Sequence, residues 1–362
     1  MDASRRNSVE EARLAGNAYG HALRRVFEAI KTVEADPNIS LEQKRKTLAK
    51  LFSRLSWRDV KPSFAQQLVR KRIGVSFRAS ISHLRLVKHE AKKYGYLIAP
   101  GGNPKMEDRA FAQALDVPTP VTIATGLLVS EVVPRPDSVI KPVSGAASRG
   151  VFLIDTDLKA HSVRTGRKYS SFHVGFEEEY GDTTLGELPV WMVESRIGTA
   201  EEPARDLKVF CFYGKSALVE EIHRNAHASG KNSYCFYYPS GETVRVDTNR
   251  PWVEGKGFPS ALLEYAERIS LSTPVPFLRV DFIESGGQLV LGEITPHPGG
   301  TYAGQLHEHI DKQLGECFLD AEARLFRDLI EGKNFETYFS SYPDSRNIRA
   351  VQELSLIHIS EP

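Results

Sequence analysis

Two acidic residues, Asp281 and Glu293, lie in neighbouring segments whose composition predicts a β-hairpin. Each acid belongs to an apolar, β-prone run, and the two runs span Phe277–Ile283 and Gln288–Ile294. Between them, Ser285–Gly287 favours a turn. Two carboxylates on adjacent strands could hold one divalent cation, because Mg²⁺ takes oxygen ligands and often uses one or two carboxylates together with substrate phosphates. The two acids therefore indicate metal-dependent phosphate chemistry.

The register of this hairpin decides whether the two acids meet. With a three-residue loop, Asp281 pairs with Leu291 and Arg279 pairs with Glu293, so the acids lie diagonally across one face, roughly 7–8 Å apart. Arg279 then stands beside both acids. Side-chain alternation predicts two shared faces, which are Arg279, Asp281 and Ile283 on the first strand, and Leu289, Leu291, Glu293 and Thr295 on the second.

A simpler interpretation of the same stretch is an edge hairpin whose outward face happens to be charged. A slip of one residue in the register would place Asp281 and Glu293 on opposite faces and remove the metal site. From these residues alone, both interpretations stay open.

A lysine followed by a loop of small residues forms a second candidate site. Val139–Pro142 and Val151–Ile154 read as strands, and Ser144–Gly150 is the loop between them. The backbone N–H groups of small residues can approach phosphate oxygens closely, and Lys141 would add a point charge. The P-loop sequence G-x-x-x-x-G-K-S/T is absent. Taken alone, this pattern is weak evidence for phosphate binding.

Two further segments carry charged side chains on expected strands. Val190–Glu194 is an apolar strand that ends in an acid. Asp206 and Lys208 are two residues apart in a hairpin strand, so they share a face. The alternative for this second pair is a charged face that simply meets solvent.

Taken in order, these motifs resemble the ATP-grasp superfamily and, within it, the TupA-like branch, which is associated with teichuronopeptide and other polysaccharide biosynthesis. The motifs are Asp108-Arg109, KPVSG (141–145), VE followed by DLK (193–208), RVDF followed by GEIT and PHPGG (279–300), and D-x-x-L-G (311–315). The resemblance covers roughly residues 105–325. Relatives usually carry Asn where Thr295 stands, and Lys where Arg109 stands.

The resemblance implies an α+β ATP-grasp fold, with two α+β lobes that clasp ATP. The helical spacing of apolar residues, and not the resemblance, predicts a helical N-terminal region before it. The resemblance also implies ATP and Mg²⁺ as cofactors. It implies Asp281, Glu293 and Thr295 as metal ligands; Arg109, Lys141, Ser144, Gly145, Arg149 and Lys208 at the phosphates; Glu194 and Asp206 at adenine and ribose; and Arg279 with Lys141 as catalytic residues. Free backbone groups of Met192–Val193 would meet adenine. For Arg109, a surface salt bridge remains the alternative.

The activity that this resemblance implies is ATP-dependent joining of a carboxylate and an amine through an acyl-phosphate, in cell-surface polysaccharide or peptide-polymer biosynthesis. The substrates would be small molecules, or glycans or peptides. One alternative is a kinase that phosphorylates a sugar or polyol hydroxyl. Another is a nucleotide-binding scaffold that has lost catalysis, which the departures at Thr295 and Arg109 keep open.

Composition narrows the class of protein. Lys and Arg together number 47 against 46 for Asp and Glu, so the net charge of +1 favours neither nucleic acid nor a membrane surface as partner. The three cysteines lack metal-type spacing and read as reduced thiols. We find no signal peptide at the N-terminus and no membrane-spanning run, so we expect a cytoplasmic protein.

The chain divides into a helical region at 1–95 and an ATP-grasp domain at 96–345, with a lid lobe at about 136–193 and a metal-binding lobe at about 194–330. Asp36–Asn38 breaks the first helix, and Ser40 with Gln43 is a capping box for the second. The helical region is basic, which suits either a solvated surface or a docking partner. The tail 354–362 resembles a translated sequencing adapter, and we exclude it from the fold.

Overall fold

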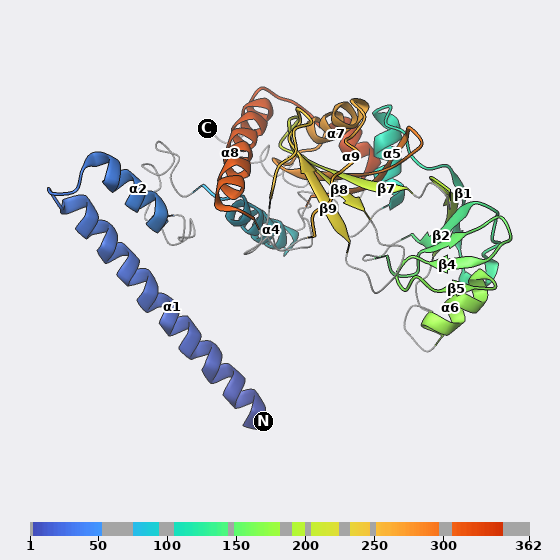
Figure 1. Ribbon diagram of the computed structural model, residues 1–362, viewed down its shortest axis with the longest axis horizontal. Coiled ribbons are helices and arrows are strands. Elements are labelled where there is room, and N and C mark those ends of the chain that lie inside the picture. Colours follow the sequence, from blue (N-terminus) through green and yellow to red (C-terminus); the bar gives the residue numbers. More distant parts are fainter. Residues whose placement is uncertain are drawn as a thin grey trace, which may run out of the picture. The chain divides into compact units, whose positions relative to one another are not determined.

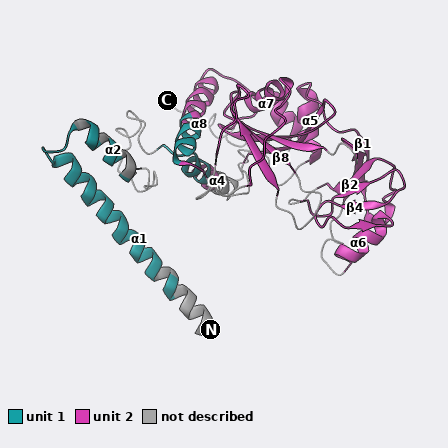
Figure 2. Cartoon of the chain, in the orientation of Figure 1, with its two compact units in different colours: residues 1–82, 308–316 teal, residues 83–307, 317–362 magenta. Residues whose placement is uncertain are grey.

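The computed structural model forms two compact units, residues 1–82 with 308–316, and residues 83–307 with 317–362 (Figure 2). The structure describes residues 3–52, 75–93, 105–143, 148–181, 190–199, 204–223, 232–246, 251–296 and 306–342. The predicted class is confirmed, since helices precede a region of antiparallel sheets (Figure 1). The predicted boundaries at 95 and 345 stay predictions.

The first unit begins with two helices, α1 (Ala3–Ala35) and α2 (Leu41–Phe52). The capping box is confirmed, because the Gln43 backbone N–H donates to Ser40 Oγ over 3.3 Å and the Ser40 N–H donates to Gln43 Oε1 over 3.2 Å. Such reciprocal bonds satisfy amide groups that have no partner within the helix. The sequence signal therefore fixes the start of α2.

The D-x-x-L-G motif has a structural role in this unit. Asp311, in the first turns of α8 (Glu308–Ile330), accepts hydrogen bonds from Ser76 Oγ over 2.7 Å and from the Arg78 N–H over 2.9 Å. It thereby caps α4 (Phe77–Lys93). A Cβ on Gly315 would lie 2.7 Å from Val75 Cγ1, so this position requires glycine.

The second unit contains a six-stranded antiparallel sheet in the order β1-β6-β2-β3-β4-β5. Its strands are β1 (Thr122–Leu127), β2 (Ser138–Pro142), β3 (Phe152–Ile154), β4 (Ala160–Ser162), β5 (Lys168–Tyr169) and β6 (Trp191–Ser195), with the 3₁₀ turn η2 (Val129–Glu131) after β1 and helix α6 (Phe172–Tyr180) after β5. The predicted strands around Lys141 and Glu194 are thus neighbours, β2 and β6.

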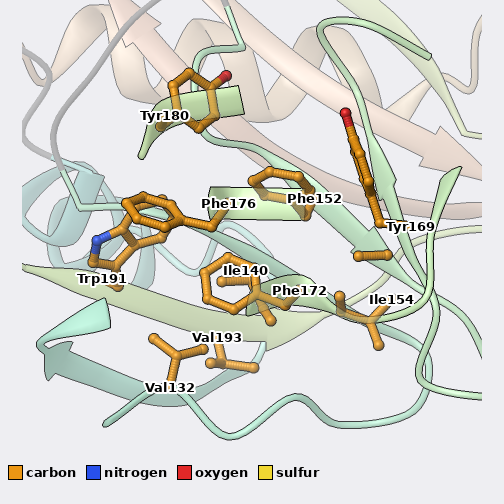
Figure 3. Close-up of a cluster of buried hydrophobic side chains, with 11 residues drawn as sticks. Val132, Ile140, Phe152, Ile154, Tyr169, Phe172, Phe176, Tyr180, Trp191 and Val193 are labelled. Atoms are coloured by element: carbon orange, nitrogen blue, oxygen red, sulfur yellow. The ribbon is translucent and has the colours of Figure 1, made fainter. Parts of the chain in front are cut away.

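An aromatic core holds α6 against this sheet (Figure 3). The rings of Phe172 and Phe176 each lie 5.5 Å from the Trp191 ring, and Phe152 lies 5.4 Å from Phe172. Burying large aromatic side chains dominates core energetics, and edge-to-face contacts add to it. The fully buried Trp191 belongs to β6, so this core fixes the strand that carries Glu194.

A five-stranded antiparallel sheet in the order β11-β10-β7-β8-β9 forms the other half of this unit. Its strands are β7 (Arg205–Cys211), β8 (Ser216–His223), β9 (Ser233–Tyr237), β10 (Leu278–Ser285) and β11 (Gln288–Thr295), and the helices beside them are α5 (Lys105–Ala114), α7 (Ala261–Leu271) and α9 (Glu336–Ser341). Helix α7 packs against β7, β8 and β10, and α5 packs against β11 and α9.

Among the described residues, no helix is both long enough and apolar enough to span a lipid bilayer.

Candidate active site

The two acids of the β10–β11 hairpin lie directly opposite each other. Asp281 pairs with Glu293, and Arg279 pairs with Thr295. The turn has two residues, Gly286 and Gly287, with φ of 56° and 80°. Two consecutive positive φ values are those of the type I′ turn that matches the twist of a hairpin. The predicted hairpin is therefore confirmed, and its acids share one face.

The predicted register was wrong, and a β-bulge explains the difference. A regular hairpin with this two-residue turn would pair Asp281 with Gly292 and turn Glu293 to the opposite face. The ladder instead shifts between Asp281 and Phe282, and Gly292 is the extra residue. A Cβ there would lie 3.2 Å from the Asp281 carbonyl oxygen, so the bulge favours glycine.

The bulge also corrects the predicted faces of the second strand. Leu289 and Leu291 pair with Glu284 and Phe282, so they lie on the face away from Asp281. The prediction that they share the face of Glu293 was wrong, because an inserted residue reverses the alternation on one side of it. Among the residues predicted to share that face, the bulge separates the leucines from the acid.

Two cations surround the Asp281 carboxylate. Arg279 donates to it through Nε and Nη2, each over 2.7 Å, and Lys208 on the neighbouring strand β7 forms an ion pair with Oδ2. Burial opposes the charged carboxylate, but Lys208 and Arg279 more than offset burial and lower the pKa of Asp281 below its usual value. Asp281 is therefore ionised and held in one orientation.

Of the two acids, Glu293 is the one whose negative charge the surroundings disfavour. Burial and the nearby charge of Asp281 raise its pKa, while Lys208, Arg279 and Lys105 act in the opposite direction. Two like charges on directly opposed residues repel each other. A divalent cation between them would relieve this repulsion and supply the missing positive charge.

The oxygens around these acids fit a magnesium ion. Thr295 Oγ1 is buried and has no hydrogen-bond partner among the described residues, which leaves a polar atom unsatisfied beside Arg279. Within the same part of the chain, His, Cys, Asp and Glu side chains form no metal cluster of three or more. An ion here would therefore depend on Asp281, Glu293, Thr295 and substrate oxygens, which is a common arrangement for Mg²⁺.

A second charged group lies in the six-stranded sheet. The buried Glu194 on β6 forms ion pairs with Arg109 of α5 through Oε2 and with Lys141 of β2 through Oε1. Arg109 also donates to Thr122 Oγ1 over 2.7 Å. The predicted alternative for Arg109 was a surface salt bridge. Arg109 does form a salt bridge, but the bridge is buried, because both Arg109 and Glu194 are buried. Each oxygen of Glu194 thus holds one of the cations predicted to meet phosphates.

Helix α5 connects the two charged groups. Asp108 is buried and accepts a hydrogen bond from the Ile294 N–H over 3.2 Å, next to Glu293, and another from Tyr342 Oη over 2.7 Å. Burial raises the pKa of Asp108 to about 7. Because Asp108 fixes α5 against β11, its neighbour Arg109 is directed toward Glu194.

Lys105, at the start of α5, is a residue that motif reasoning missed. Its ammonium donates to the Pro142 carbonyl oxygen over 2.9 Å. Burial lowers the pKa of Lys105; Glu293 opposes this effect, and Arg109 adds to it. The sequence carried one signal for Lys105. It lies one helical turn before Arg109, and residues four apart share a helix face, so both cations could be expected to point to the same site.

Electrostatic interactions join the acids and cations of the two sheets. Burial lowers the pKa of Lys141 well below its usual range, and the charges of Arg109 and Lys105 lower it further, while Glu293 acts in the opposite direction. Glu293 interacts with the charges of Lys105 and Lys208 as well. Of the residues predicted for metal and for phosphate binding, the structure therefore brings together Asp281, Glu293, Arg109, Lys141 and Lys208.

The loop after Lys141 is described at its two ends. Ser144 and Gly145 lie outside the described residues. At the far end, Gly150 has φ of 71°, and a Cβ there would lie 3.0 Å from Pro142 Cγ and from Trp191 Cη2. Gly150 therefore closes the loop onto the strand that carries Lys141, and Arg149 beside it is exposed.

Two other predictions concern strands β6 and β7. Asp206 and Lys208 share a face of β7, as their pairing with Ile283 and Asp281 shows. By contrast, β6 lies between β1 and β2, with Met192 and Val193 paired on both sides. The prediction that these two residues offer free backbone groups was therefore wrong, because a central strand uses both of its edges in the ladder.

Comparison with known proteins gives one family. The model of the family described as TupA-like ATPgrasp matches residues 126–319. None of the curated proteins compared with this sequence matches it.

Similar solved structures include three ligases. D-alanine–D-alanine ligase from Bacillus anthracis complexed with ATP is 16% identical, with 68% of this chain and 76% of that chain covered and a TM-score of 0.38. The ATP-grasp ligase PsnB complexed with a minimal precursor is 10% identical (61% and 60% covered, TM-score 0.34), and L-amino acid ligase from Bacillus licheniformis is 14% identical (64% and 52% covered, TM-score 0.38). The match spans less than two thirds of the latter two chains, and each likeness is too low to transfer an activity.

Proposed function

Because this chain belongs to the TupA-like ATP-grasp family, whose model matches more than half of its residues, we propose that it is an ATP-dependent carboxylate–amine ligase acting through an acyl-phosphate. The observation that carries this proposal is the direct pairing of Asp281 with Glu293. Asp281 and Glu293, with the Thr295 hydroxyl nearby, would hold a magnesium ion, which would supply positive charge for substrate phosphates.

The charge of the site supports a polyanionic substrate. Five cationic side chains interact with Glu293, with Glu194 or with one another; they are Lys105, Arg109, Lys141, Lys208 and Arg279. The acids among them are Asp108, Glu194, Glu220, Asp281 and Glu293. A bound Mg²⁺ adds further positive charge. The phosphates of a nucleoside triphosphate could pair with the cations of this cluster once magnesium binds the two acids of the hairpin.

The proposed reaction has two steps. A substrate carboxylate oxygen attacks the γ-phosphorus of ATP, the bond to the β–γ bridging oxygen breaks, and ADP leaves. An amine then attacks the acyl carbon, phosphate leaves with the C–O bonding electrons, and the amine loses a proton to give the amide. Magnesium, when bound, neutralises charge on the terminal phosphates.

The chain's own residues have distinct roles in this proposal. Lys141, Lys208 and Arg109 bind phosphate oxygens, with Ser144, Gly145 and Arg149 as the predicted loop contacts, and Asp206 takes ribose hydroxyls. Glu194 holds Arg109 and Lys141 in place. Arg279 stabilises charge that develops on the transferred group. We propose polysaccharide or peptide-polymer biosynthesis as the setting, and 96–345 as the ATP-grasp domain.

Product analysis tests the proposal. The full chain is incubated with ATP and Mg²⁺ and with a panel of amino acids, polyglutamate and uronic-acid acceptors, and products are identified by mass. A ligase gives ADP, phosphate and an amide that joins the two substrates. A phosphoester product would instead establish the kinase alternative.

Two variants distinguish a ligase from an inactive scaffold. Acceptor-dependent ATP consumption should disappear in Asp281→Ala and Glu293→Ala, and it should persist in the control Asp157→Asn, which changes an exposed acid that pairs with Lys159. Nucleotide binding without any ATP consumption over the whole panel would favour the scaffold.

A further inference from the structure

Helix α9 reaches the candidate site through one side chain, that of Tyr342, which directly follows the helix. The helix packs against α5 (Figure 1), and the Tyr342 hydroxyl donates to Asp108 Oδ1 over 2.7 Å. The other oxygen of this carboxylate, Oδ2, accepts a hydrogen bond from the Ile294 N–H over 3.2 Å. Both bonds are buried. Asp108 therefore links the end of α9 to strand β11.

Ile294 lies between Glu293 and Thr295, which we propose as metal ligands. In the part of the chain that the structure describes, β11 is an outer strand of its sheet. Buried backbone groups on such an edge need partners from outside the ladder. The Ile294 N–H has its partner in Asp108, so this carboxylate holds the strand at the point where it carries the two proposed ligands.

Two tyrosines of this segment lie near Asp108, and they differ in one respect. Tyr338 and Tyr342 are both buried, and the centroids of their rings lie 4.8 Å apart. The ring of Phe111 on α5 contacts both, each at a centroid distance of 5.6 Å. Tyr342 Oη donates to Asp108, whereas Tyr338 Oη has no hydrogen-bond partner among the described residues. The two tyrosines therefore share their ring packing and differ in the hydroxyl contact.

We propose that Tyr342 is a positioning residue for the metal site, which acts through Asp108 and the Ile294 N–H. The carboxylate of an aspartate rotates easily about its last torsion unless both of its oxygens are held. Tyr342 holds Oδ1, so Oδ2 stays directed at β11, and the backbone at Ile294 keeps the orientation that the side chains on either side need. This inference rests on the proposed function for the presence of a divalent cation, but it does not require ligation.

A purely structural role for Tyr342 would be to attach α9 to α5. Loss of that attachment would loosen the whole region, so the amides of β11 would exchange their hydrogens faster alike. A positioning role predicts a local effect at Ile294, because the Leu291 N–H on the same strand has a different partner, the Pro118 carbonyl oxygen, over 2.8 Å. Hydrogen exchange at these two amides therefore separates the two roles.

The first test measures amide hydrogen exchange in the full chain without metal or nucleotide. Tyr342→Phe removes the hydroxyl and keeps the ring, and the matched control Tyr338→Phe removes the hydroxyl that has no partner among the described residues. We expect exchange at Ile294 to become about tenfold faster in Tyr342→Phe, as loss of one hydrogen bond to a charged group implies, and exchange at Leu291 to change less than about twofold. Tyr338→Phe should leave both rates unchanged. Equal acceleration at both amides in Tyr342→Phe, or none at Ile294, would overturn the inference.

The second test measures metal binding directly, by calorimetric titration of Mg²⁺ into the full chain with a non-hydrolysable ATP analogue. Tyr342→Phe should weaken Mg²⁺ binding about three- to tenfold, somewhat less than loss of a direct partner of a metal ligand does. Tyr338→Phe should bind Mg²⁺ like the unaltered chain. Unchanged Mg²⁺ binding in Tyr342→Phe would refute the positioning role.

A double variant tests whether Tyr342 acts through Asp108. In an Asp108→Ala background, Tyr342→Phe should have no further effect on Mg²⁺ binding, because the link to Ile294 is already lost. Losses that add in the double variant would show that Tyr342 acts by another route. If Asp108→Ala does not fold, the exchange rates at Ile294 and Leu291 in Tyr342→Phe still decide between the two roles.

The outcome of these tests is separable from the outcome for the proposed function. If the unaltered chain binds Mg²⁺ with the ATP analogue but forms no amide from any substrate pair, the ligase proposal fails, and a selective effect of Tyr342→Phe on Ile294 and on Mg²⁺ binding still supports the positioning role. If the unaltered chain binds no divalent cation, the metal site and the positioning role fail together.

Discussion

Asp281 lies directly opposite Glu293 because Gly292 inserts one residue into strand β11. The two acids differ in what surrounds them. Asp281 forms ion pairs with Arg279 and Lys208, whereas burial and Asp281 itself disfavour the charge on Glu293. Removing either charge should therefore abolish metal-dependent activity but change the stability of the free protein in opposite directions.

Asp281→Asn should lower the free energy of unfolding by about 2–3 kcal/mol, because the half-buried Arg279 and Lys208 lose their charged hydrogen-bond acceptor and keep only the interaction with Glu293. Glu293→Gln should leave stability unchanged or raise it by up to about 1 kcal/mol, because it removes a like charge. Denaturant unfolding without metal or nucleotide measures both values. A loss of stability in Glu293→Gln as large as in Asp281→Asn would contradict this account of the pair.

The buried hydroxyl of Thr295 has no hydrogen-bond partner among the residues that the structure describes, so its removal should cost the free protein nothing. We expect Thr295→Val to be as stable as the unaltered chain or up to about 1 kcal/mol more stable. The same variant should need more Mg²⁺ for half-maximal ATP consumption, because it removes a proposed ligand. A Mg²⁺ titration of ATP consumption measures the shift.

The buried Thr273 provides a matched control for that variant. Its hydroxyl donates to the Ile269 carbonyl oxygen over 2.8 Å, so Thr273→Val should destabilise the chain by about 1 kcal/mol. Its Mg²⁺ requirement should stay unchanged. If Thr295→Val costs as much stability as Thr273→Val, the Thr295 hydroxyl has a partner in solution and is not held ready for a metal ion.

Local sequence signals predicted most elements that carry the site. The capping box at Ser40, the β10–β11 hairpin and the strand that carries Lys141 follow from short-range preferences, and the structure has all three. These features depend on residues close in sequence, where turn chemistry and side-chain alternation act directly. The ordered motifs then gave the family, since single motifs are weak and their order is specific.

Features that depend on distant residues were missed or mistaken. The register failed at Gly292, because a glycine within a strand pattern indicates a bulge only weakly, and its consequence depends on the opposing strand. The strand β6 was expected to have free backbone groups, and the sequence did not reveal that β1 and β2 flank it. Lys105 was missed because its partner Pro142 belongs to a different element.

The raised pKa of Asp108 predicts how stability changes with pH. Between the unfolded value near 3.8 and the folded value of about 7, the folded chain binds more protons at this residue than the unfolded chain. Its contribution to stability is therefore fully present below about pH 4 and is lost as pH rises toward 7, by up to about 1.4 kcal/mol per pH unit.

Asp108→Asn tests this pH dependence, because it removes the titrating group. The asparagine side chain can still accept a hydrogen bond from the Ile294 N–H and can form another with Tyr342 Oη. The variant should flatten the dependence of unfolding free energy on pH between about 4 and 7. The control Asp157→Asn changes an exposed acid that pairs with the exposed Lys159. In this control, the unfolding free energy should depend on pH as it does in the unaltered chain. An unchanged slope in Asp108→Asn would show that other groups titrate in this range.

Glu194 offers the strongest test of the cation cluster, because it holds Arg109 and Lys141 together. Glu194→Gln should lower the free energy of unfolding by about 3–5 kcal/mol, since both buried cations lose their counter-charge. An anion that binds between them can replace that charge.

Phosphate or ATP should therefore raise the melting temperature of Glu194→Gln by more degrees than it raises that of the unaltered chain, as thermal unfolding over a ligand series would show. The double variant Glu194→Gln/Lys141→Met, which removes one of the two cations, should lose most of this additional stabilisation. If anions stabilise Glu194→Gln no more than the unaltered chain, Arg109 and Lys141 do not form an anion site, and their assignment to the phosphates fails.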